Sequence, residues 1–147
     1  MSLKKLIPAF VVFYSIIGIH QAGAQCRSYT KRKCLPRLAP YMNNGQLNTA
    51  LMSPGQTAEI LMNFNSGQSY RIVVCGEGVL GPIEFQVKDA TGSVLFNNKT
   101  KDAISDFWDF KMDQTSQLTL FVKVPEQVDK TQFNTVGCVT VLVGFRK

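Results

Sequence analysis

The chain has almost no histidine and few charged residues. Its 147 residues include one histidine, His20, and charged side chains make up 18% of the total. His20 lies in an N-terminal segment that we expect to be removed, which leaves no imidazole to act as a general base or metal ligand. This absence argues against a Ser-His-Asp triad, a Cys-His pair and histidine-bearing zinc sites. We therefore expect no enzymatic activity, no metal site and no cofactor.

The main apolar run is also too short to cross a bilayer. Two lysines precede a stretch from Leu6 to Ile19, and a small-x-small sequence follows that ends at Ala24. A membrane span needs about 20 apolar residues, whereas this order is typical of a secretory signal peptide. We predict that residues 1–24 are cleaved and that the mature chain begins at Gln25, with no transmembrane span. The alternative is a lipid anchor at Cys26, which requires a small residue in place of Gln25.

Positive charge is concentrated in one short segment. The formal net charge is +6 for the whole chain, and removal of two lysines with residues 1–24 leaves +4. In the predicted mature chain five cations precede the first acidic residue, Glu59: Arg27, Lys31, Arg32, Lys33 and Arg37. The remainder is close to neutral, so no chain-wide basic field is available for nucleic acid, which we exclude as a partner.

The basic segment 25–45 also contains prolines and shows neither a helical nor a strand period. We predict that it is an irregular N-terminal arm, closed by a disulfide. Its cations, together with Tyr29, are the strongest candidate interaction site, for an acidic protein surface, an anionic glycan or lipid head groups. The alternative is a solvated polar loop.

All four cysteines, Cys26, Cys34, Cys75 and Cys138, lie in the predicted mature chain. An even number in an exported protein predicts two disulfides, and three connectivities are compatible with four cysteines. We favour Cys26–Cys34, within the arm, and Cys75–Cys138, between two predicted strands distant in sequence. Without histidine or a C-x-x-C motif, the spacing favours structural disulfides over a metal or redox site.

Alternating apolar and polar residues predict about eight short strands and no amphipathic helix. One-sided strands bury that side against a second sheet, so we predict that residues 46–147 form an all-β, two-sheet antiparallel β-sandwich, jelly-roll-like and stabilised by disulfides. The valine-rich last strand is expected to be central and covered on both faces. The predicted strands are 47–52, 58–64, 70–75, 83–88, 94–96, 108–112, 118–124 and 137–145.

Five strand motifs follow one another between residues 56 and 145: Y-R-I-V-V, I-E-F-Q-V-K-D-A-T-G-S-V-L, F-W-D-F, L-T-L-F-V-K-V and G-C-V-T-V-L-V-G-F. Their order resembles the pre-peptidase C-terminal domain, a small bacterial β-sandwich appended to secreted enzymes. With the A-Q signal end and the C-x7-C-L-P arm, the layout is more similar to small exported proteins of Bacteroidota with no assigned activity. These resemblances imply a β-sandwich and supply no catalytic residues.

An acidic group surrounds the single tryptophan, Trp108. Carboxylate oxygens bind calcium and an aromatic face stacks on a sugar ring, so the group is a candidate calcium or glycan site. The alternative is a set of solvated loop acids beside a strand whose Trp108 packs in the core, because the spacing lacks the order of a calcium-binding loop. The four acids are Asp102, Asp106, Asp109 and Asp113.

These patterns predict an exported, non-catalytic module that binds a protein or glycan ligand in the bacterial periplasm, at the cell surface or after secretion. One alternative is a structural component of an envelope assembly that pairs through exposed edge strands. Another is a small glycan hydrolase that uses paired carboxylates. The sequence leaves the ligand and the oligomeric state open. The candidate binding residues are Arg27, Tyr29, Lys31, Arg32, Lys33, Arg37, Asp106, Trp108 and Asp109.

Overall fold

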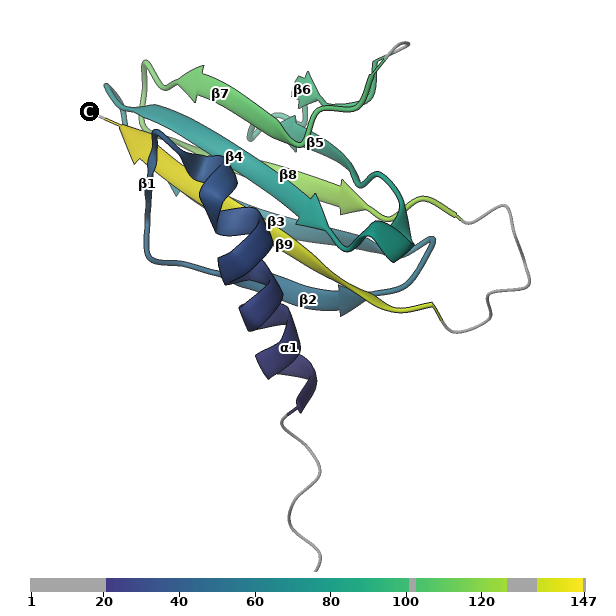
Figure 1. Cartoon of the computed structure of the whole chain (residues 1–147). Helices are drawn as coiled ribbons and strands as arrows, with labels where there is room; N and C mark the ends of the chain where they lie inside the picture. Colours follow the sequence, from purple (N-terminus) through teal and green to yellow (C-terminus); the bar gives the residue numbers. More distant parts are fainter. Residues whose placement is uncertain (1–20, 101–102, 127–134, 147) are drawn as a thin grey trace, which may run out of the picture.

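The described residues form nine strands and an N-terminal helical segment (Figure 1). The computed structural model describes residues 21–100, 103–126 and 135–146. The helical segment consists of α1 (Gln21–Tyr29), the π-helical η1 (Thr30–Cys34) and the 3-10 turn η2 (Leu35–Leu38). The strands are β1 (Met42–Asn43), β2 (Asn48–Met52), β3 (Thr57–Phe64), β4 (Ser69–Gly76), β5 (Glu84–Lys88), β6 (Val94–Asn97), β7 (Phe107–Lys111), β8 (Ser116–Lys123) and β9 (Gly137–Arg146), with a 3-10 turn η3 (Gly78–Leu80) after β4.

The strands build two antiparallel sheets. Sheet A has the order β1-β9-β4-β7, with β2 also paired to β9, and sheet B has the order β3-β8-β5-β6. The chain pairs with itself about the β5–β6 hairpin, so that β4 pairs with β7, β3 with β8 and β2 with β9. This doubled ribbon, wound over two sheets, is a jelly-roll-like arrangement. The predicted all-β sandwich is confirmed.

Strand alternation decides which side chains enter the core between the sheets. In β8, Leu118, Leu120 and Val122 are buried, while the two residues between them are half-buried. The eight predicted strands are all present, with ends within two residues of the prediction. The buried part of this core comprises Met52, Phe64, Tyr70, Ile72, Val74, Leu80, Ile83, Phe85, Val87, Leu118, Leu120, Val122, Val124, Val139, Val141 and Val143.

Sheet A is covered on its outer face as well. Residues 137–144 of β9 are all buried, which confirms the prediction of a central strand covered on both faces. The outer cover is the helical segment Gln21–Leu38, here called the cover segment, which contacts β2, β4 and β9 (Figure 1). The prediction of an irregular arm and no helix is therefore wrong for this segment.

The buried face of the cover segment consists of Cys26, Thr30, Cys34 and Leu38, each four residues after the last. Four helical residues advance about 6 Å along an α-helix, and two strand residues advance about 6.6 Å. Residues four apart on the helix are therefore spaced almost equally to successive outward-facing residues of a strand, so each can pack on one of them. Because the wider π turn offsets the rotation that such steps accumulate in an α-helix, the same face stays on the sheet.

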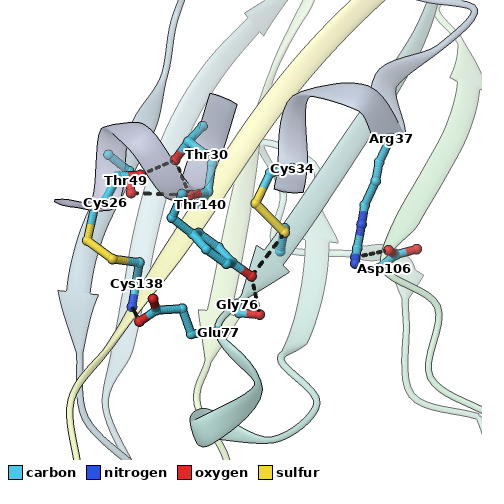
Figure 2. The surroundings of a disulfide bond; sticks show 12 residues. Cys26, Thr30, Cys34, Arg37, Thr49, Gly76, Glu77, Asp106, Cys138 and Thr140 are labelled. Atoms are coloured by element: carbon cyan, nitrogen blue, oxygen red, sulfur yellow. Dashed lines mark hydrogen bonds and ion pairs between the residues drawn. A yellow bond between two sulfur atoms is a disulfide. The ribbon is translucent and has the colours of Figure 1, made fainter. Parts of the chain in front are cut away.

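The structure contains two disulfides, but not in the predicted pairing. Cys26 is bonded to Cys138 and Cys34 to Cys75, with Cα–Cα distances of 5.3 and 5.8 Å (Figure 2). The predicted Cys26–Cys34 pair is wrong because the segment is helical: two residues eight apart lie roughly 12 Å from each other along the axis of an α-helix, beyond the reach of a disulfide. Each cysteine instead points down to the sheet, so the disulfides tie the cover segment to β9 and β4.

Close packing of the cover segment also explains a glycine near the end of β9. A Cβ atom on Gly144 would lie 2.7 Å from Cβ of Tyr41 and 3.0 Å from Cδ2 of Leu38. Any side chain there would push the end of the cover segment away from the sheet. The small second core under this segment contains Cys34, Leu38, Val73, Cys75 and Leu142.

Candidate functional site

Four of the predicted binding residues project from the solvent side of the cover segment. Arg27 is on α1, and the other three are consecutive residues of η1; all four are exposed. Because the opposite face of the segment is buried on sheet A, the charged ends of these side chains point into solvent. The set Arg27, Lys31, Arg32 and Lys33 is called the basic surface below.

The basic surface has no neutralising partner within the part of the chain that the structure describes. The salt bridges there join Arg37 to Asp106, Arg71 to Asp109 and Lys99 to Glu84. None of them involves a residue of the basic surface. Four exposed cations on two adjoining helical turns therefore create a local positive potential.

Tyr29 fixes the cover segment instead of facing solvent. Its side chain is half-buried, and its hydroxyl donates a 2.7 Å hydrogen bond to the carbonyl oxygen of Gly76, close to Sγ of Cys75. Burial raises the pKa of Tyr29, with a smaller upward contribution from Glu77. The hydroxyl thus remains a protonated donor at neutral pH and joins α1 to the end of β4.

A buried threonine network lies beneath the basic surface (Figure 2). The hydroxyls of Thr30 and Thr140 are hydrogen-bonded at 2.7 Å, and the hydroxyls of Thr140 and Thr49 are 3.1 Å apart. Thr30 also donates to the carbonyl oxygen of Cys26. Each buried hydroxyl therefore has a partner, which offsets the cost of removing it from water. This network joins the cover segment to β9 and β2.

The last basic residue of the cover segment meets the predicted acidic group. Nη1 of Arg37 donates to Oδ2 of Asp106 across the outer side of sheet A (Figure 2). In the sequence these two residues belong to separate candidate sites, the basic arm and the acidic group. Tertiary structure joins them, because η2 ends above the turn that leads into β7.

Arg71, which is not among the candidate residues of the sequence, joins β7 to the backbone at the end of the cover segment. Its guanidinium donates to both carboxylate oxygens of Asp109, at 2.6 and 2.7 Å, and to the backbone oxygens of Arg37 and Ala39. The hydrogen bond to Asp109 is the main reason that the pKa of Arg71 is raised, so the charge is permanent. Arg71 also lies over the ring of Phe107. An arginine in the outward position of an otherwise apolar strand is the sequence signal that could have identified it.

Trp108 lies on the opposite face of β7 from Asp109. Its ring stacks between Phe96 and Phe110, with centroid distances of 5.1 and 4.2 Å, against the core between the sheets. Successive residues of a strand point to opposite faces, so Trp108 and its neighbouring acids do not form one site. The structure thus supports the core interpretation of Trp108.

The acidic group is dispersed in the structure. Asp113 is exposed beyond the end of β7, and Asp102 lies outside the described residues. Within 21–100, 103–126 and 135–146, no three histidine, cysteine or acidic side chains are grouped in a way that could hold a metal ion.

A small half-open hollow adjoins Arg37 and Asp106. Its volume is about 140 Å³. Its walls come from η2, the end of β4, the turn at 81–83 and the segment 104–106. β4 continues to Gly76, whereas its pairing with β7 ends at Val73, and this difference in length leaves space at the edge of the sheet.

Comparisons with known proteins show only distant similarity of shape. No known protein-family model matches the chain, and a search of curated proteins finds no match. The crystal structure of PliG from Aeromonas hydrophila, a periplasmic inhibitor of g-type lysozyme, is 9% identical, with a TM-score of 0.49 over 73% of this chain and 89% of that chain. The solution structure of a de novo designed double-stranded β-helix is 15% identical, with a TM-score of 0.32 over 69% and 99% of the two chains.

The resemblance to pre-peptidase C-terminal domains stays a prediction, as does that to exported Bacteroidota proteins. In the described part of the chain, no helix combines the length and apolar character needed to cross a membrane.

Proposed function

We propose that the protein is an exported, non-catalytic module that binds an acidic protein surface through the basic surface Arg27, Lys31, Arg32 and Lys33. The observation that carries the proposal is the absence of any described ion pair for these four exposed cations. Such a surface raises the rate at which a partner of opposite charge associates and favours it over other partners.

The way in which the basic surface is held supports a binding role. Two disulfides and the threonine network join the cover segment to sheet A, from Cys26 at one end to Cys34 at the other. A surface that is already ordered loses little conformational entropy when a partner binds. The disulfides and the predicted signal peptide also favour an exported setting.

Binding to poly-L-glutamate, measured by biolayer interferometry at increasing NaCl concentrations, tests the proposal. The double variant Lys31→Gln/Lys33→Gln is expected to bind about tenfold more weakly and to lose part of its salt dependence. The matched control Lys88→Gln/Lys123→Gln removes the same charge from the outer face of sheet B and is expected to change binding less than about twofold.

Two outcomes would contradict the proposal. Equal losses in both double variants would mean that binding reports net charge alone. Binding of polygalacturonate through Lys31 and Lys33, without binding of poly-L-glutamate, would replace the acidic protein by an anionic glycan.

A further inference from the structure

We propose that the hollow beside Arg37 receives a carboxylate side chain of the acidic partner, with the guanidinium of Arg37 as its hydrogen-bond donor. This inference rests on the proposed function and names the contact that would give it specificity. Arg37 lines the hollow and follows Lys33, a residue of the basic surface, by four residues on the same cover segment.

The size of the hollow selects a single side chain. Sites for small molecules and cofactors usually have volumes of about 300–1,000 Å³. The hollow has about 140 Å³, which corresponds to roughly five water molecules. An aspartate or glutamate side chain fits this space, which is smaller than the usual site for a whole small molecule.

Arg37 has unused capacity to bind an anion. A guanidinium carries five N–H donors, and in the described structure Arg37 makes one side-chain hydrogen bond, from Nη1 to Asp106. Its side chain is 48% exposed. An incoming carboxylate can therefore pair with the remaining donors, in the two-bond geometry that favours arginine over lysine.

The walls of the hollow are fixed before any partner arrives. The Cys34–Cys75 disulfide joins the cover segment to the wall formed by β4. The carbonyl of Asp106 accepts a 2.8 Å hydrogen bond from the backbone N–H of Val74. Arg71 holds the backbone of η2 through its bond to Arg37 O. Pre-ordered walls reduce the entropic cost of inserting a side chain.

The ion pair between Asp106 and Arg37 in the free protein makes the proposal testable, because Asp106 competes with an incoming carboxylate. Under the proposal, Arg37→Gln removes the donor and weakens binding of poly-L-glutamate about tenfold. Asp106→Asn removes the internal competitor and strengthens binding about threefold. The two variants break the same ion pair, so a purely structural role of that pair predicts that both weaken binding. Opposite effects that are each larger than the change caused by the single-charge control Lys88→Gln support the inference. Equal losses, no change in either variant, or effects no larger than that of Lys88→Gln overturn it.

A second measurement locates the contact. Titration of the ¹⁵N-labelled protein with a tetraglutamate peptide is expected to shift the amide signals of Gly81 and Ser105, and Arg37→Gln is expected to abolish those shifts. Shifts that persist in Arg37→Gln would overturn the assignment of the donor. Thermal melting of each variant, with unchanged disulfides by mass analysis, checks that the fold is retained.

The experiments separate this inference from the proposed function. If Lys31→Gln/Lys33→Gln weakens binding while Arg37→Gln does not, the basic surface binds the partner and the hollow does not. If neither variant affects binding, both proposals fail.

Discussion

The outer face of sheet A is buried, whereas the outer face of sheet B is exposed to solvent, although the strands of the two sheets are similar in length. On β9 the outward residues Cys138, Thr140 and Leu142 are all buried beneath the cover segment. On β8 the outward residues Gln117 and Thr119 are exposed or half-buried and lie under no helix of the described structure. Sheet A is thus the middle of three layers, whereas sheet B has a solvated side.

This difference explains where the candidate site lies. The solvated face of sheet B is maintained by strand alternation alone, with mostly polar residues outward. The cover of sheet A must be held by bonds between parts of the chain distant in sequence, and those bonds also position Arg27, Lys31, Arg32 and Lys33. A comparison of matched substitutions on the two faces tests this account.

Loss of the disulfides is expected to have the largest effect. The bond Cys26–Cys138 spans 112 residues and Cys34–Cys75 spans 41. In the chain-entropy model these loops correspond to about 5 and about 4 kcal/mol, so paired substitution of either disulfide by serines should lower the free energy of unfolding by amounts of that order. Urea unfolding under non-reducing conditions measures the loss. A change below about 1 kcal/mol for both pairs would show that the cover contributes little to the stability of sheet A.

The second core under the cover segment should behave like the main core. Leu142 on β9 and Leu120 on β8 are both 0% exposed, the first beneath the cover and the second between the sheets. Leu142→Ala and Leu120→Ala are each expected to cost about 3 kcal/mol in urea unfolding, because each leaves a cavity. A much smaller loss for Leu142→Ala would mean that the cover segment closes over the gap and packs loosely.

The two faces should also respond differently to loss of a hydroxyl. Thr140→Val removes the central member of the buried threonine network and is expected to cost about 1–2 kcal/mol, because Thr30 and Thr49 lose a partner. Thr119→Val makes the same chemical change on the solvated face of β8 and should alter stability by less than about 0.5 kcal/mol. Thermal or urea unfolding of both variants measures the contrast, and equal losses would argue against a sealed cover.

The smallest effect is expected from the hairpin of sheet B. Its turn residue Asp89 accepts hydrogen bonds from the hydroxyl and N–H of Thr91 and from the N–H of Ser93, and these bonds, led by the Thr91 hydroxyl, lower the pKa of Asp89. The stability that they supply is present above the pKa of an unfolded aspartate and is lost as pH falls through the lower pKa in the folded protein. Melting curves of the wild type and Asp89→Asn should therefore converge at acidic pH, and a constant difference would contradict this assignment.

Sequence alternation predicted the strands because the pleat is a local property. Leu118, Leu120 and Val122 define the inner face of β8 whatever lies across the sandwich. The sequence does not predict the cover segment as a helix because its buried face contains two cysteines and Thr30, which do not form an apolar stripe, and because Pro36 and the nearby Pro40 are typical of a loop. The signal for a helix in the sequence is the spacing of Cys26, Thr30, Cys34 and Leu38, which follow one another at every fourth position.

The sequence by itself determined the all-β class, the positions of the strands and the central place of the valine-rich strand β9. Tertiary structure decided the disulfide pairing, the separation of Trp108 from Asp109 and the meeting of Arg37 with Asp106. Alternation reports which face a residue occupies, and it carries no information about what covers that face. The third layer, with the cations that it presents, follows from contacts between residues far apart in the chain.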